Sequence, residues 1–170
     1  MLDQLKQLPG LPAKPRFADV GTGSGALGIT AKLELPKAQV ELLEVDPKAL
    51  KVAQKNVDKY ATSISVVLSD LLTSSNQAND VLLCNLPYVP DSHTINQAAS
   101  KEPRLAIFGG PDGLDIYRQL FTQVQKLPKR PLFILTESLP PQQTALAKIA
   151  ERFDYELYKT DDFIQVFRQS

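Results

Sequence analysis

Three glycines at alternate positions, Gly21, Gly23 and Gly25, follow a short apolar segment that carries Asp19. Glycine allows positive backbone φ angles and lets a ligand lie directly against the main chain. An apolar run resumes after the loop, as at the start of a helix. The spacing therefore predicts a strand, a ligand-binding loop and a helix between Phe17 and Gly28, with a nucleotide or nucleoside bound at the loop.

Two kinds of ligand fit this loop. Gly21, Gly23 and Ala26 match the G-x-G-x-x-G/A dinucleotide pattern, and Glu44 follows at about the expected distance. The carboxylate of Asp19 would repel a pyrophosphate, but it would attract a ligand that carries ammonium and sulfonium groups. This favours S-adenosylmethionine, while a structural turn in which Asp19 binds nearby backbone N–H groups is the alternative.

Further acidic residues follow the next two predicted strands. Asp46 precedes Pro47, which is the pattern of a helix N-cap, so Glu44 is the better candidate to bind the ribose hydroxyls. Asp70 follows the third strand and is predicted to accept a hydrogen bond from the adenine amino group. A solvated acid for Glu44 and a cap of the next turn for Asp70 are the alternatives. The predicted cofactor-binding set is Asp19, Gly21, Thr22, Gly23, Gly25, Glu44, Val45, Asp70, Leu71 and Asn85.

The fourth strand runs into Asn85, Leu86, Pro87 and Tyr88. Ligands of open parallel sheets bind beyond the carboxyl ends of strands, so this tetrapeptide is expected beside the glycine loop. The carbonyl of Asn85 and a backbone carbonyl near Pro87 could accept both N–H groups of a planar nitrogen, turning its lone pair toward a methyl donor. Tyr88 offers a flat face to the substrate. The residues therefore predict methyl transfer to an amide or exocyclic amine, with a polar turn as the alternative.

The remaining pattern predicts an α/β fold in which strands alternate with helices. We expect a doubly wound, mostly parallel sheet of seven strands with an antiparallel C-terminal strand, because the last two strands are joined by too short a turn for a crossover. The predicted strands are Phe17–Val20, Gln39–Val45, Ile64–Leu68, Val81–Cys84, Leu132–Leu135, Tyr155–Tyr158 and Phe163–Phe167. Helices are indicated by Ala26 to Leu33, Leu50 to Val57, Leu114 to Val124 and Leu146 to Phe153.

Length and composition fit one domain, with residues 1–16, a possible short helix followed by prolines, as a lead-in or linker and 17–170 as the catalytic domain. Lysine plus arginine equals aspartate plus glutamate at 19 each, which disfavours nucleic-acid binding by bulk charge. The single cysteine, Cys84, fits a reducing cytosol and excludes an internal disulfide. Neither a membrane span nor a signal peptide is indicated, so a cytoplasmic location is expected. His93, the one histidine, is expected to be a solvated loop residue.

Five motifs together resemble the HemK/PrmC family of glutamine N5-methyltransferases that act on peptide-chain release factors. They are DVGTGSGALGI, LEVDPKAL, SDLL, NLPY and EPRLAIFGGPDGLDIYR, the last being the most specific. The resemblance implies a Rossmann-like class I methyltransferase fold, S-adenosylmethionine as cofactor and a release factor as protein substrate, with no stable nucleic-acid or membrane partner. Metal ligands are not implied.

The resemblance also assigns roles. It places the catalytic and substrate-orienting residues at Asn85, Pro87 and Tyr88, and extends the substrate site over Leu86, Glu102 and Arg104. The turn from Phe108 to Asp112 is expected to form a wall of that site. Glu137 and Gln142 match family positions and are expected to be structural or peripheral.

The chain departs from the family in two places. Leu86 stands where the family commonly has proline, and sixteen residues precede Phe17 where the family has a helical domain. The sequence is thus expected to be a catalytic-domain piece or a short form. NLPY is also compatible with adenine, so three hypotheses stay open: a release-factor glutamine methyltransferase, an adenine N6-methyltransferase acting on RNA or DNA, and an inactive cofactor-binding subunit.

Overall fold

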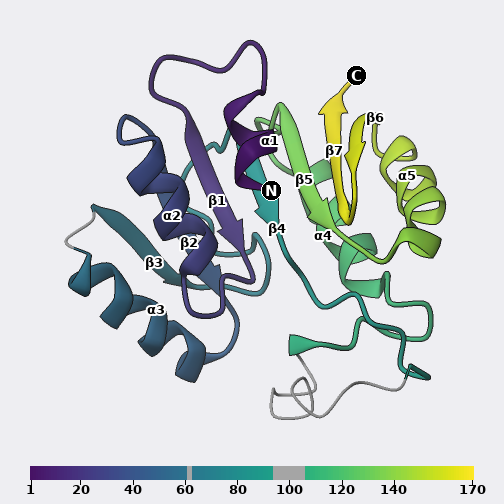
Figure 1. Ribbon diagram of the computed structural model, residues 1–170, viewed down its shortest axis with the longest axis horizontal. Helices are drawn as coiled ribbons and strands as arrows, with labels where there is room; N and C mark the ends of the chain where they lie inside the picture. Colours follow the sequence, from purple (N-terminus) through teal and green to yellow (C-terminus); the bar gives the residue numbers. More distant parts are fainter. Residues whose placement is uncertain (61–62, 94–105) are drawn as a thin grey trace.

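The computed structural model is described here for residues 1–60, 63–93 and 106–170 (Figure 1). Glu102 and Arg104 lie outside these ranges. The elements in chain order are α1 (Leu2–Lys6), β1 (Arg16–Val20), α2 (Ala26–Glu34), β2 (Gln39–Glu44), α3 (Pro47–Lys59), β3 (Ile64–Leu68), β4 (Val81–Cys84), α4 (Asp115–Gln125), β5 (Phe133–Glu137), the 3₁₀ helix η3 (Pro140–Gln142), α5 (Gln143–Glu151), β6 (Tyr155–Asp161) and β7 (Ile164–Gln169).

The strands form one seven-stranded sheet in the order β3-β2-β1-β4-β5-β7-β6. Strands β1 to β5 are parallel to one another, whereas β7 is antiparallel to both β5 and β6. The predicted doubly wound sheet with an antiparallel C-terminal strand is therefore confirmed. The strand order reverses between β1 and β4, which is where an open sheet of this kind has its ligand crevice.

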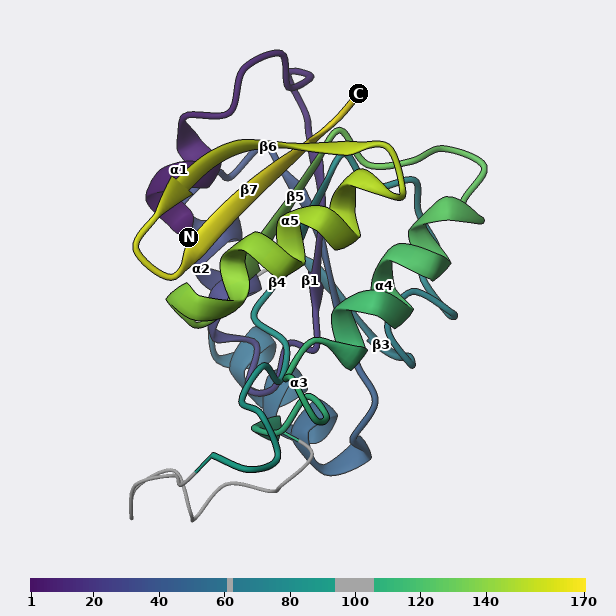
Figure 2. The same ribbon diagram turned by 90° about the vertical axis from the view of Figure 1, so that its right-hand side faces the viewer.

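Helices cover both faces of the sheet. Apolar residues of α1, α2 and α3 pack with one face, and those of α4 and α5 pack with the other, so that the core consists of two layers. Figure 2 looks toward the β6 and β7 edge of the sheet, with α1 and α2 on the left and α4 on the right. The four residues of β4 are all fully buried, as expected for a strand covered on both faces. Among the described residues, no helix is long and apolar enough to span a bilayer.

Residues 1–16 contribute to the first of these layers. Leu5 is only 1% exposed and belongs to the same apolar cluster as Phe17 and Phe133. The side-chain amide of Gln4 donates a hydrogen bond to the carboxylate of Asp161 in β6. The short helix α1 thus packs against the part of the sheet that α2 and α3 leave uncovered (Figure 1).

Local signals account for most element boundaries. Gly25 takes a φ of 84° immediately before α2, and the carboxylate of Asp46 accepts the Lys48 N–H at 2.8 Å as the predicted N-cap of α3. Most predicted strands differ from the observed ones by one to three residues at an end: β2 ends at Glu44 and not at Val45, β6 continues to Asp161, and β7 runs from Ile164 to Gln169. Strand β5 continues beyond Leu135 to Glu137, because its last residues pair with β7. Helix α5 ends at Glu151, so Phe153 lies past it and stacks on Phe121 at 5.9 Å.

Candidate functional site

A cavity of about 470 Å³ lies at the carboxyl ends of β1 and β4, between the glycine loop and the segment after β4. Its size falls within the range of small-molecule sites. The lining residues come from both predicted motifs and from β5: Asp19, Gly21, Thr22, Gly23, Ser24, Ala26, Leu27, Asn85, Leu86, Pro87, Tyr88, Val89, Ala106, Ile107 and Glu137. The structure thus brings the predicted cofactor loop and the predicted substrate tetrapeptide together.

The three glycines of the loop after β1 have positive φ angles, which residues with a side chain rarely adopt. Gly21, Gly23 and Gly25 have φ angles of 67°, 57° and 84°. A Cβ added at Gly21 would lie 2.7 Å from Cδ2 of Leu86. Leu86, which replaces the family's proline, is itself 3% exposed, so it packs the tetrapeptide directly against the loop.

Asp19 is buried beneath this loop, with an exposed fraction of 2%. Its Oδ2 accepts hydrogen bonds from the Thr22 hydroxyl at 2.5 Å and from the Gly28 N–H at 2.8 Å. Burial raises the pKa of this carboxyl to about 6, opposed by the two hydrogen bonds and assisted by the negative charge of Glu44. The structural alternative for Asp19 is therefore present in the fold, while the same residue also lines the cavity.

Glu44, at the end of β2, is 7% exposed and is bound by backbone N–H groups. Its Oε2 accepts from Gly23 at 2.7 Å, and its Oε1 accepts from Val45 and Asp46 at 2.9 Å each. Since a carboxylate has about four acceptor positions, one position on Oε2 is left for a ligand hydroxyl. Glu44 therefore holds the loop in place and is not merely a solvated acid.

Five of the predicted cofactor residues, Gly25, Glu44, Val45, Asp70 and Leu71, do not line the cavity. Val45 is 59% exposed after β2, and Asp70 is exposed after β3. The carbonyl of Asp70 accepts the Thr73 N–H at 3.1 Å, and Leu71 next to it has a φ of 52°. The contact of Asp70 with the adenine base, and those of Val45 and Leu71 with the cofactor, stay predictions.

Two side chains of the tetrapeptide, those of Asn85 and Tyr88, line the cavity and differ in their hydrogen bonding. Asn85 is exposed, and its side-chain amide makes no hydrogen bond with any residue in the described ranges. Tyr88 is partly buried, and its hydroxyl donates to Oε1 of Glu137 at 2.8 Å. Burial, followed by this hydrogen bond and the charge of Glu137, raises the pKa of Tyr88 to about 12. Asn85 thus has a free amide, whereas Tyr88 is fixed.

The segment 107–113 packs against the end of the tetrapeptide and the residue that follows it. Val89 and Ile107 are joined by a backbone hydrogen bond of 3.0 Å, and Gly109 donates back to Val89 at 3.0 Å. A Cβ at Gly109 would come within 2.4 Å of the Pro87 oxygen, and one at Gly113 within 2.0 Å of the Tyr88 oxygen. Of the expected wall from Phe108 to Asp112, no residue lines the cavity, which Ala106 and Ile107 reach instead.

Sequence reasoning missed the roles of three residues from other elements. Glu137 lines the cavity and accepts the Tyr88 hydroxyl, and the Gln142 amide donates to the carbonyls of Tyr88 and Asp112, both at 2.7 Å. The buried Tyr117 hydroxyl lies 2.6 Å from the Glu137 carbonyl and 3.1 Å from that of Cys84. The sequence indicated Glu137 and Gln142 only through their match to family positions. Their contacts with Tyr88 were not predictable, because Tyr88 is remote from both in the sequence.

Two other residues take little part in the site. His93 is exposed, and Cys84 is fully buried, which raises the pKa of its thiol well above the usual value. Within the described ranges, no group of three or more His, Cys, Asp or Glu side chains could hold a metal ion.

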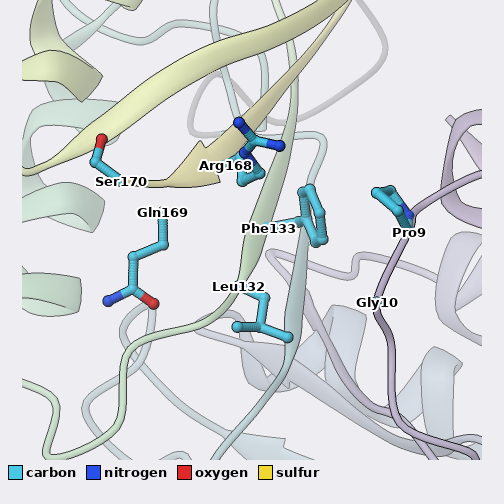
Figure 3. Close-up of a pocket in the computed structure, with 7 residues that line it drawn as sticks. All are labelled: Pro9, Gly10, Leu132, Phe133, Arg168, Gln169 and Ser170. Carbon is cyan, nitrogen blue, oxygen red and sulfur yellow. The ribbon is translucent and has the colours of Figure 1, made fainter.

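A second depression, of about 540 Å³, lies at the amino ends of the parallel strands, where β5 begins and β7 ends (Figure 3). Figure 3 shows the Phe133 ring between Arg168 and Pro9. The Arg168 guanidinium is paired with Glu156 and lies 5.2 Å from the centre of the Tyr158 ring. Its cation is already bound within the protein, so we assign no chemistry to this depression.

A family profile described as "Methyltransferase small domain" matches residues 1–102, more than half of the chain. The chain belongs to the methyltransferase small domain family. This agrees with the fold and confirms the resemblance seen in the motifs, because the curated relatives include proteins named release factor glutamine methyltransferase. The protein of that name from Deinococcus radiodurans is 35% identical over 112 residues, which is 65% of this chain and 40% of that protein. The one from Moorella thermoacetica is 42% identical over 109 residues, which is 61% of this chain and 38% of that protein.

This methyltransferase domain spans less than half the length of these curated relatives.

Solved structures confirm the class I methyltransferase fold. A methyltransferase from Pyrococcus furiosus is 14% identical with a TM-score of 0.69, covering 98% of this chain and 79% of that one. A ribosomal protein L11 methylase from Lactobacillus delbrueckii is 15% identical with a TM-score of 0.67, covering 99% and 78%.

Proposed function

We propose that this methyltransferase domain transfers a methyl group from S-adenosylmethionine to the side-chain amide nitrogen of a glutamine in a peptide-chain release factor. The observation that carries the proposal is the single cavity shared by the glycine loop and Asn85–Tyr88. A cofactor on the loop and an amide at the tetrapeptide would meet there. The names of the curated relatives support the release factor as substrate.

The charges of the cavity fit this cofactor and not a dinucleotide. Two carboxylates, Asp19 and Glu137, line the cavity, and its described lining contains no lysine or arginine. Such a wall attracts a ligand with ammonium and sulfonium groups and repels a pyrophosphate. We propose that Asp19 and the loop hold the amino-acid end, Glu44 and Val45 the ribose, and Asp70 and Leu71 the adenine. When bound, S-adenosylmethionine supplies an electrophilic methyl group.

The tetrapeptide would orient the acceptor nitrogen. An amide nitrogen is a poor nucleophile because its lone pair is delocalised into the carbonyl group. The free side-chain oxygen of Asn85 can accept one N–H of the substrate amide. The Pro87 carbonyl lies against Gly109, so the Leu86 carbonyl is the backbone acceptor that we propose for the second N–H. Orientation and electrostatics of this kind lower a barrier without a strong base, since the proton can leave after the methyl group arrives.

Label transfer tests the function. The protein is incubated with S-adenosylmethionine labelled in its methyl group and, in separate reactions, with a release factor, the same release factor with its target glutamine replaced, RNA or DNA. We expect label on the unaltered release factor alone. Label on adenine of a nucleic acid would contradict the proposal, and cofactor binding by calorimetry without transfer to any substrate would indicate a non-catalytic subunit.

The Asn85→Ala variant tests the site within that function. We expect cofactor affinity to change less than about twofold while transfer falls by about two orders of magnitude or more, because Asn85 acts on the acceptor. Asn76→Ala provides the matched control, since its side chain makes no hydrogen bond with a described residue and does not line the cavity. A large loss of cofactor affinity in Asn85→Ala would mean that the substrate half of the site is elsewhere.

A further inference from the structure

Glu137 lies directly beside the tetrapeptide because of the sheet register. Strands β4 and β5 are parallel, and Cys84 pairs with Thr136, so the next residues of the two strands are Asn85 and Glu137. The Glu137 backbone is fixed on two sides. It pairs with Ile164 of β7, and its carbonyl accepts the Tyr117 hydroxyl at 2.6 Å. A carboxylate on such a backbone is a rigid acceptor at the cavity wall.

Tyr88 is held at both of its ends. Its hydroxyl donates to Oε1 of Glu137 at 2.8 Å, and its carbonyl accepts from the Gln142 amide at 2.7 Å. Gln142 is itself buried, and its Oε1 accepts the Leu139 N–H at 2.9 Å. Since both partners are anchored, the position of the Tyr88 ring is set before any ligand binds.

The hydrogen bond between Tyr88 and Glu137 is of the stronger kind, because its acceptor is a charged carboxylate. The pKa of Tyr88, raised to about 12, keeps its phenol protonated at neutral pH, so the hydroxyl stays a donor. Only Oε1 of Glu137 has a side-chain partner among the described residues. Among the described residues, the Glu137 carboxylate therefore has one side-chain hydrogen-bond partner, which is the Tyr88 hydroxyl.

We propose that Glu137 is a positioning residue of the methyl-transfer site, acting through the Tyr88 phenol to hold its ring against the planar group of the substrate. The expected effect on kcat rests on the proposed function. The structural part of the proposal, the control of Tyr88 by Glu137, does not depend on the identity of the substrate.

A kinetic double-mutant cycle tests the proposal with Glu137→Ala, Tyr88→Phe and the double variant. A hydrogen bond to a charged group accounts for roughly tenfold or more in rate, so we expect each single variant to lower kcat by about that factor. The KM for the protein substrate should change less than about twofold in every variant, and so should the cofactor Kd in Tyr88→Phe. Loss of the Glu137 charge from the cavity wall should weaken cofactor binding, so kcat is measured at saturating cofactor. Because Glu137 acts through the phenol, Glu137→Ala should have no further effect in the Tyr88→Phe background.

The conservative variant Glu137→Gln separates positioning from a general structural role. Its side-chain oxygen can still accept the hydroxyl, so most of kcat should return. Thermal unfolding of every variant, with Glu151→Ala at an exposed position as matched control, shows whether the fold survives. An equal loss of kcat from Glu137→Ala in both backgrounds, or no recovery in Glu137→Gln, would overturn the proposal.

The titration of Tyr88, followed by NMR of ring-labelled tyrosine, needs no substrate. In the wild-type chain Tyr88 should remain protonated above its ordinary range, with a pKa of about 12. In Glu137→Gln the pKa should fall by part of this shift, because the neighbouring charge is gone while burial, the largest cause, remains. An unchanged titration would overturn the proposal. A shifted titration in a protein that fails to methylate any release factor would leave the positioning supported and the proposed substrate wrong.

Discussion

At the scale of residues, Asp19 combines a cost to stability with a predicted role in binding. The fold buries its carboxyl group, which raises the pKa from an ordinary value of 3.8 to about 6. Between these two values the folded chain holds a proton that the unfolded chain has released. Stability therefore falls as pH rises through this window, and above about pH 6 the ionised carboxylate costs roughly 3 kcal/mol. A charged ligand group at the cavity would offset that cost.

The Asp19→Asn variant should separate these two effects. An asparagine oxygen can still accept from Thr22 and Gly28 without carrying a charge. At about pH 8 we expect a higher unfolding free energy than wild type, by one to a few kcal/mol, and a weaker affinity for S-adenosylmethionine. Near pH 4 the two stabilities should converge. Urea unfolding and calorimetry at both pH values measure this, with exposed Asp91→Asn as control. Unchanged cofactor affinity would remove the argument that Asp19 faces a cationic group.

The residues that line the cavity were predictable where the signal is local. The glycine loop and Asn85–Tyr88 are recognisable from a few consecutive residues, and the structure places them around one cavity. Glu137 and Gln142 are expected from the sequence to be structural or peripheral, but their contacts with Tyr88 were not predictable, because these join residues 49 and 54 positions apart in the chain. Such contacts are set by strand register and by the path of loops, neither of which a single sequence states.

At the scale of elements, continuous apolar runs made the parallel strands predictable. Strands β3 and β4 have the predicted ends, because polar residues limit both apolar runs. The end of β5 was missed because Thr136 and Glu137 are polar, yet their backbones pair with β7. Pairing between distant strands thus extends an element beyond what its own side chains indicate.

Helix α3 gives a test of local prediction at this scale. Asp46 caps it by accepting the Lys48 N–H, so Asp46→Ala should lower the unfolding free energy by about 0.5–2 kcal/mol. The control is Asp58→Ala in the last turn of the same helix, where an acidic side chain opposes the helix dipole and little or no loss is expected. Chemical denaturation measures both. Equal losses would show that the cap contributes nothing specific.

At the scale of the whole molecule, the two ends of the sheet differ in what they offer. The carboxyl end carries the cavity with two acidic side chains and a free asparagine amide. The opposite end carries a depression whose one charged side chain, Arg168, is already paired. The strand order places all the predicted chemistry at the first end, as doubly wound sheets do. Docking of residues 1–16 could not be predicted from their composition, because proline and glycine there indicate only a lead-in.

The packing of α1 on the sheet leads to the last prediction. Leu5 is 1% exposed within an apolar cluster that also includes residues of β1, β4 and β5. Leu5→Ala should therefore lower the unfolding free energy by roughly 2 kcal/mol, near the low end for buried leucine, because a helix of five residues can detach locally. Leu33→Ala, at a leucine that is 51% exposed, should cost much less. No α1 residue lines the cavity, so cofactor affinity should change less than about twofold in both variants. Urea unfolding and calorimetry measure the two effects, and an unaltered unfolding midpoint in Leu5→Ala would show that α1 does not stabilise the sheet in solution.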